Sequence, residues 1–140
     1  MWLSKKAGYG LKAMFALACA GPRNNGLRTV EIATREGIPV KFLETILVDL
    51  RKAGLLTSKR GPDGGHRLAR DPARITVGEI WRAIDGPISA TGLRASASAN
   101  PYQFVWSKVE RAASEVADTT TLQDVVRQAE ERNRILAFDI

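Results

Sequence analysis

The chain has 140 residues and a hydrophobic fraction of 44%, which suits one compact domain with a real core. It contains one cysteine, Cys19, which excludes an intrachain disulfide framework and a cysteine-rich metal site. The net charge of +6 is unevenly spread, because residues 1–80 hold 14 Lys and Arg against 7 Asp and Glu, and residues 81–140 hold 7 against 8. This asymmetry favours a nucleic-acid-binding half joined to a neutral assembly half.

An amphipathic helix is predicted over about residues 4–20. Its apolar residues Leu11, Met14, Phe15 and Ala18 recur at i, i+3, i+4 and i+7, and a Gly-Pro pair follows it. A secretory signal needs no such stripe, and no apolar run approaches the roughly 18 residues of a membrane span. We therefore expect a cytoplasmic protein that does not enter a membrane.

Residues 29–53 predict two short helices joined by a tight turn. The first helix begins at Thr29, whose hydroxyl is expected to cap it, and ends at Gly37. The second covers about residues 40–53 and has a mixed polar outer face. Its inward side is an apolar stripe at helical spacing, formed by Leu43, Ile46, Leu47 and Leu50. This order is typical of a helix-turn-helix.

A small β-hairpin is predicted next, with strands over residues 55–59 and 66–70. Residues 60–65, RGPDGG, supply the glycine, proline and aspartate of a tight tip, and basic residues flank it. A phosphate-cradling enzyme loop is disfavoured, since the Lys-Ser/Thr of a P-loop is missing and no helix follows directly. The first part of the chain is thus expected to be a mostly α winged helix-turn-helix with a β-hairpin wing.

A further helix is expected to begin in a capping box formed by Thr76 and Glu79, with Trp81 in its apolar face. Residues 87–100, PISATGLRASASAN, predict a flexible loop. The boundaries expected are a DNA-binding domain over 1–86, this loop over 87–100, and a dimerisation helix with a last helix over 101–140.

The long helix expected from Pro101 carries a narrow apolar seam that calls for a partner helix. About 17 residues at 1.5 Å rise give it a length of roughly 25 Å. A second capping box, Thr121 to Asp124, begins the last helix. The seam residues expected at the dimer interface are Val105, Val109, Ala112 and Val116.

The segments LSKKAGYGLKAM, VEIATREGIPVKFLETILVDLRKAGLLTSKRGPDGGHRLAR and ITVGEIWRAIDGP resemble the Rrf-type family of bacterial winged-helix transcriptional regulators. The resemblance covers about residues 3–88 and continues weakly into the long helix. It implies a homodimer whose long helices cross and place two recognition helices on a pseudo-palindromic DNA operator.

The resemblance also implies roles for single residues. Glu44 matches the family's base-reading glutamate, Lys41 a neighbouring groove contact, and Arg60 the wing tip. A carboxylate accepts hydrogen bonds only, so Glu44 would select the N4 amino group of cytosine, and Arg60 suits a narrow minor groove. The alternative for Glu44 is an ion pair with Lys41 on the helix surface. Expected base contacts are Lys41, Glu44, Thr45 and Arg60, and expected phosphate contacts are Ser4, Lys5, Lys6, Lys52, Lys59, His66 and Arg67.

The family's best-known members hold an iron–sulfur cluster through three cysteines in the loop before the long helix. The corresponding segment here, SATGLRASASAN, has none, and thiolates are what such clusters require. We therefore expect no cofactor and no metal. An atypical cluster shared across the dimer through Cys19 is the alternative for a redox or cluster sensor.

The function predicted is that of a sequence-specific, homodimeric DNA-binding repressor. An effector, either a small molecule or a protein, is expected near residues 87–100, Trp81 and Trp106. A winged helix used as a protein-interaction module is the rival, and it would bind DNA weakly without regard to sequence. An enzyme is not supported, because no nucleophile–base pair, paired carboxylates or metal-ligand set is apparent.

Overall fold

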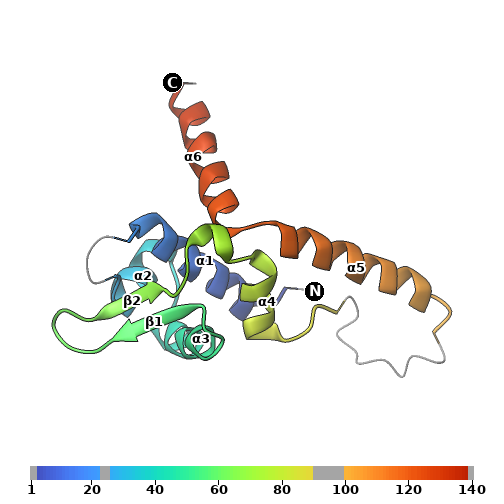
Figure 1. The fold of residues 1–140 in the computed structure, drawn as a ribbon, viewed down its shortest axis with the longest axis horizontal. Helices are drawn as coiled ribbons and strands as arrows, with labels where there is room; N and C mark the ends of the chain where they lie inside the picture. Colours follow the sequence, from blue (N-terminus) through green and yellow to red (C-terminus); the bar gives the residue numbers. More distant parts are fainter. Residues whose placement is uncertain (1–2, 23–25, 90–99, 139–140) are drawn as a thin grey trace.

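The computed structural model describes residues 3–22, 26–89 and 100–138. These residues form six α-helices, one 3-10 helix and a two-stranded antiparallel hairpin (Figure 1). The mostly α fold with a small hairpin that the sequence predicts is confirmed. In chain order the elements are α1 (Lys5–Ala20), α2 (Thr29–Glu36), α3 (Val40–Lys52), β1 (Leu56–Lys59), β2 (Gly65–Leu68), η1 (Pro72–Arg74), α4 (Val77–Asp85), α5 (Gln103–Thr119) and α6 (Leu122–Phe138).

One hydrophobic core joins the helices α1, α2, α3 and α4, the hairpin, and Leu122 at the start of α6. The predicted stripe of α3 is confirmed, since its four residues are at most 3% exposed. Helix α1 packs closely on α4 at Gly10, where an added Cβ would overlap the Cδ1 atom of Ile84. Met14 and Ile32 bring α1 and α2 into the same core with no exposed surface. The outer face of α3 is thereby fixed as the solvent-facing side of a rigid unit.

Two of the helix starts differ from the sequence prediction. Helix α1 begins at Lys5, because Ser4 is its cap and accepts a 2.9 Å hydrogen bond from the Ala7 N–H. The prediction that Thr29 caps α2 is wrong, since the cap residue is Arg28, whose backbone N–H donates to the Glu31 carboxylate at 3.1 Å. The end of α2 is confirmed, with Gly37 in the left-handed conformation at φ 65°.

The two predicted capping boxes have different outcomes. At α4, the Thr76 hydroxyl accepts from the Glu79 N–H at 3.1 Å, but the Glu79 carboxylate pairs with Arg70 at 2.6 Å. At α6 both halves form, since Asp124 N–H donates to the Thr121 hydroxyl at 3.1 Å and Thr121 N–H donates to the Asp124 carboxylate at 2.9 Å.

The wing strands pair in the register Leu56 with Leu68 and Lys59 with Gly65. Strand β1 begins one residue later than predicted, at Leu56, and β2 ends two residues earlier, at Leu68. Leu27 forms an isolated β-bridge with His66 of β2, because the two residues exchange backbone hydrogen bonds of 3.0 and 2.7 Å. The wing is therefore joined to the segment that leads into α2.

The last two helices leave the body in different directions, α5 to one side and α6 outward (Figure 1). The turn between α5 and α6 is hydrogen-bonded to the residues around the start of α4. The Val77 N–H donates to the Thr120 carbonyl at 2.9 Å, and the Leu122 N–H donates to the Ile75 carbonyl at 2.8 Å. Most of the predicted loop, residues 90–99, lies outside the described residues. No helix in the described part of the chain has the length and apolar character needed to span a membrane.

Candidate nucleic-acid interface

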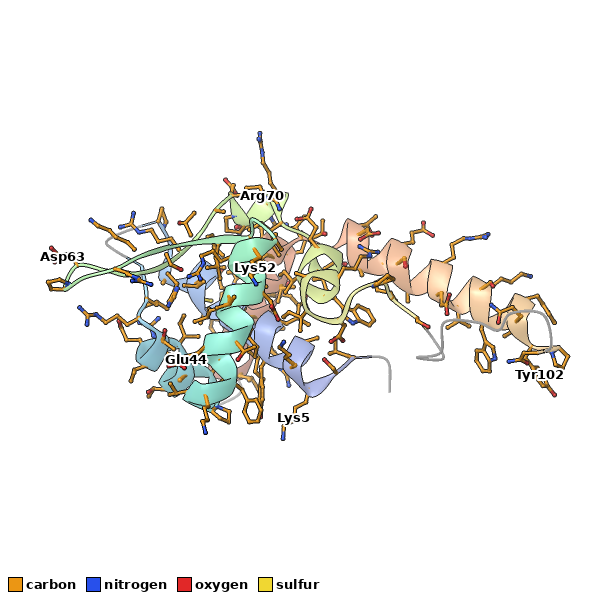
Figure 2. All side chains as sticks on the ribbon, turned by 90° about the horizontal axis from the view of Figure 1, so that it is seen from below. Lys5, Glu44, Lys52, Asp63, Arg70 and Tyr102 are labelled. Carbon is orange, nitrogen blue, oxygen red and sulfur yellow. The ribbon has the colours of Figure 1, made fainter. Side chains whose placement is uncertain are left out.

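The outward face of α3 displays the residues predicted to read bases. Lys41, Glu44 and Thr45 are exposed on the side opposite the buried stripe, and so is Lys52 at the end of the helix. Figure 2 views the molecule from this side and shows Glu44 and Lys52 on the same visible side of α3. The helix therefore presents a carboxylate, a hydroxyl and two ammonium groups to solvent, all of which can hydrogen-bond to base edges or phosphates.

The wing places cations beside this helix. Lys59, Arg60 and Arg67 are all exposed, and the wing tip, marked by Asp63 in Figure 2, projects from the body. The tight turn at the tip requires glycine at position 64, because a Cβ there would overlap the Lys59 carbonyl oxygen. The tip thus presents Arg60 beside Gly61, an exposed cation next to a residue with no side chain.

Two side-chain contacts hold the wing against α2. The Arg28 guanidinium donates to the Pro62 carbonyl oxygen at the wing tip. The ring of His66 bonds through Nε2 to the Thr29 hydroxyl at 2.9 Å and through Nδ1 to the Ser58 hydroxyl at 2.7 Å. Burial, and then the charge of Arg51, lowers the pKa of His66 below its usual 6.5. The predicted phosphate contact at His66 would compete with these two bonds.

The N-terminal stretch has internal partners as well. Ser4 caps α1 and donates its backbone N–H to the Asp85 carboxylate at 3.1 Å, and its hydroxyl bonds to the same carboxylate. The Lys6 ammonium lies 2.7 Å from the Asp49 carboxylate of α3. Lys5 is exposed, with its ammonium 5.9 Å from the centre of the Tyr9 ring. Among these three residues, Lys5 is the one placed most openly for a phosphate.

Sequence reasoning missed Arg28 and Arg51. Arg51 is exposed and lies seven residues after Glu44, two turns along the same helix, so helical spacing alone could have found it. The Arg28 side chain bonds to the Pro62 carbonyl oxygen, 34 residues later in the sequence, and no local pattern predicts that contact.

A helix-turn-helix with a β-hairpin wing, both presenting cations, defines a winged-helix DNA-binding protein. The family model Rrf2, described as an iron-dependent transcriptional regulator, matches residues 3–128. The chain belongs to the Rrf2 family. It is a DNA-binding transcriptional regulator and not an enzyme.

Among its relatives, the regulator CymR of Bacillus subtilis is 33% identical over 141 residues, and the match covers 100% of both chains. A putative rrf2-like regulator of Rhodobacter capsulatus is 46% identical over 89 residues, 62% of this chain and 59% of that protein. The alignment with CymR thus spans the whole of that protein, and the alignment with the Rhodobacter capsulatus regulator spans less than two thirds of it.

Solved structures give the same result. The structure of B. subtilis CymR, described as a global cysteine regulator, aligns with a TM-score of 0.80 at 33% identity and covers 91% of this chain and 98% of that one. The structure of T. potens IscR aligns with a TM-score of 0.77 at 37% identity and covers 94% and 90%.

The metal that the family description implies does not fit the residues present. The chain has a single cysteine, Cys19, and burial, followed by the charge of Glu36, raises the pKa of its thiol, which disfavours the thiolate that a metal needs. Both nitrogens of the chain's one histidine, His66, are already engaged. Within residues 3–22, 26–89 and 100–138, no three His, Cys, Asp or Glu side chains are grouped as a ligand set.

Proposed function

We propose that the protein is a homodimeric repressor that binds a pseudo-palindromic operator in the cytoplasm and works without a typical iron–sulfur cluster. One observation carries this proposal: the polar outer face of α3 and the cationic wing project from one rigid unit, and a separate apolar seam is open on α5.

In this proposal α3 enters the major groove and the wing enters the adjacent minor groove. The Glu44 carboxylate accepts from the N4 amino group of a cytosine, and Lys41 and Thr45 contact neighbouring base edges. Arg60 at the wing tip lies in the minor groove, where an A·T-rich tract concentrates negative potential. Glu44 is exposed and stands with Lys52 on one side of the helix, as such a geometry requires.

The phosphate contacts divide into two groups. Lys5 on α1, Lys52 on α3, and Lys59 and Arg67 on the wing are exposed and bind phosphates directly. Ser4, Lys6 and His66 bond to side chains of other helices or strands, namely Asp85, Asp49, Thr29 and Ser58, and their main role is to position the DNA-binding elements.

The dimer forms along α5. Its seam residues follow helical spacing, and Val109 and Val116 are 37% and 66% exposed in the single chain. A second copy would cover them and set the distance between two recognition helices. An effector that acts near Trp81 and Trp106 would change this distance and shift the population of DNA-competent dimers.

The experiment is selection of duplexes from a random library with the full-length chain, followed by titration of the selected site. Glu44→Ala is expected to lose the preference for the selected cytosine, a discrimination of about 1–3 kcal/mol. Glu115→Ala, an exposed glutamate of α5, is the matched control and should keep it. Weak binding without any sequence preference by the wild type would contradict the proposal and favour a protein-interaction module.

A further inference from the structure

Val48 occupies an unusual place on α3. It lies one turn after Glu44 and one turn before Lys52, on the face opposite the buried stripe. It is partly exposed, and it belongs neither to the hydrophobic core nor to the apolar side chains packed against that core. Its neighbours on this face, Lys41 and Thr45 among them, are polar and exposed. Packing in the hydrophobic core therefore does not account for a valine here.

The chemistry of a groove-facing valine is narrow. Its side chain has no hydrogen-bond donor or acceptor, so it cannot hold a phosphate or read an amino or carbonyl group. In the major groove the one apolar group on a base edge is the C5-methyl of thymine. A valine at the centre of a polar, DNA-facing helix side is thus matched to thymine and leaves the donor or acceptor groups of the other bases unpaired.

We propose that Val48 is a specificity-determining residue that reads the methyl group of a thymine in the operator half-site. The position follows from helix geometry, and it rests on the proposed role of Glu44. Four residues at 1.5 Å rise separate the two side chains by about 6 Å along α3. Since successive bases are about 3.4 Å apart, the thymine lies about two base pairs from the cytosine that Glu44 reads.

The test removes the methyl group from the DNA and the side chain from the protein, separately and together. Each thymine of the selected half-site is replaced in turn by deoxyuridine, which lacks only the C5-methyl. Wild type, Val48→Ala and Val30→Ala are titrated with each duplex. Val30 is the matched control, because it is a 63% exposed valine on α2.

At one thymine, deoxyuridine is expected to weaken wild-type binding about fourfold, the effect of one buried methyl-sized group of about 0.8 kcal/mol. Val48→Ala should bind the thymine duplex with a similar loss and should be indifferent to the replacement, and Val30→Ala should respond as wild type does. The inference is overturned if no replacement affects the wild type, or if Val48→Ala stays as sensitive as the wild type.

The two proposals fail differently. If the wild type selects no sequence, or Glu44→Ala keeps its cytosine preference, the proposed function is wrong. If Glu44 reads cytosine but no thymine methyl is coupled to Val48, only this inference is wrong. The measurement on wild-type protein with deoxyuridine duplexes needs no variant to fold.

Discussion

The guanidinium of Arg82 grips both carboxylate oxygens of Asp118, with nitrogen–oxygen distances of 2.6 and 2.9 Å. This fork joins α4 to the end of α5, and Gly78 makes room for it, since a Cβ there would overlap the Asp118 carboxylate. The α5 helix carries the proposed dimer seam, and α4 packs against α1 and α3. The fork therefore joins α5 to the helices that pack around α4.

Asp118→Asn should reduce the loss of folding stability that occurs when the pH is lowered. The hydrogen bond from Arg82 lowers the pKa of the Asp118 carboxyl below 3.8, so the fork contributes stability at neutral pH that is lost as pH falls through that lowered pKa. The two side chains are 35% and 46% exposed, so solvent screens the pair and the loss stays below about 1 kcal/mol. Thermal unfolding of both proteins between pH 3 and 7 measures it. Parallel curves over this range would show that the fork adds nothing.

His66→Phe should loosen the wing and remove a second pH effect. Because burial lowers the pKa of His66, the unfolded chain binds its proton more readily, and stability falls as pH drops below about 6.5. The phenylalanine variant loses the bonds to Thr29 and Ser58, so it should be less stable at pH 7 and less sensitive between pH 7 and 5. Thermal unfolding at these two pH values checks both statements. An unchanged pH response in the variant would contradict the assignment.

Gly26→Ala should destabilise the protein by more than about 1 kcal/mol. Gly26 has a φ of 81°, and an added Cβ would overlap the backbone carbonyl of His66, where the wing is bonded to Leu27. Gly8→Ala is the control, since it lies in α1 with no atom within 4 Å of the added Cβ, and it should gain up to about 1 kcal/mol. Denaturant unfolding of both variants measures the difference. Equal stabilities would contradict the close approach at Gly26.

Local patterns predicted those features that depend on local energetics. The apolar stripe of α3, the left-handed glycine at its upstream turn and the hairpin all follow from spacing and turn chemistry, and the structure has them. The cap of α2 was predicted wrongly because the Thr29 hydroxyl has a competing partner, His66, 37 residues later. A sequence pattern does not indicate whether a hydroxyl bonds to the backbone of its own helix or to a side chain far away in the sequence.

The same limit applies to the candidate site. Exposure of Glu44 and Lys52 could be deduced from the helical period. The engagement of Lys6 by Asp49 joins residues 43 apart, and that of Ser4 by Asp85 joins residues 81 apart. Both depend on how α1 packs against α3 and α4, which only the folded chain determines.

Lys52→Gln should weaken operator binding equally for all sequences and reduce the salt dependence. A lysine on a phosphate releases about one counterion, so the slope of log K against log salt should fall by about 1. Lys108→Gln changes an exposed lysine of α5 in the same way and should leave the slope unaltered. Titrations at several salt concentrations, on the selected site and on a scrambled duplex, measure this slope. A loss confined to the selected site would instead make Lys52 a base contact.

Val116→Asp should convert the proposed dimer to a monomer. Val116 is 66% exposed on α5 and lies two and three turns along the seam from Val109 and Val105, so in a dimer its replacement would bury a charge without a partner. Sedimentation should show the monomer mass, and affinity for the full palindrome should fall toward that for a half-site, because the two linked contacts become independent. Phe138→Asp, at a 90% exposed site near the end of α6, tests whether any exposed apolar residue has this effect. If Val116→Asp remains a dimer with full affinity, the subunits associate through another surface, and the α5 seam has a different role.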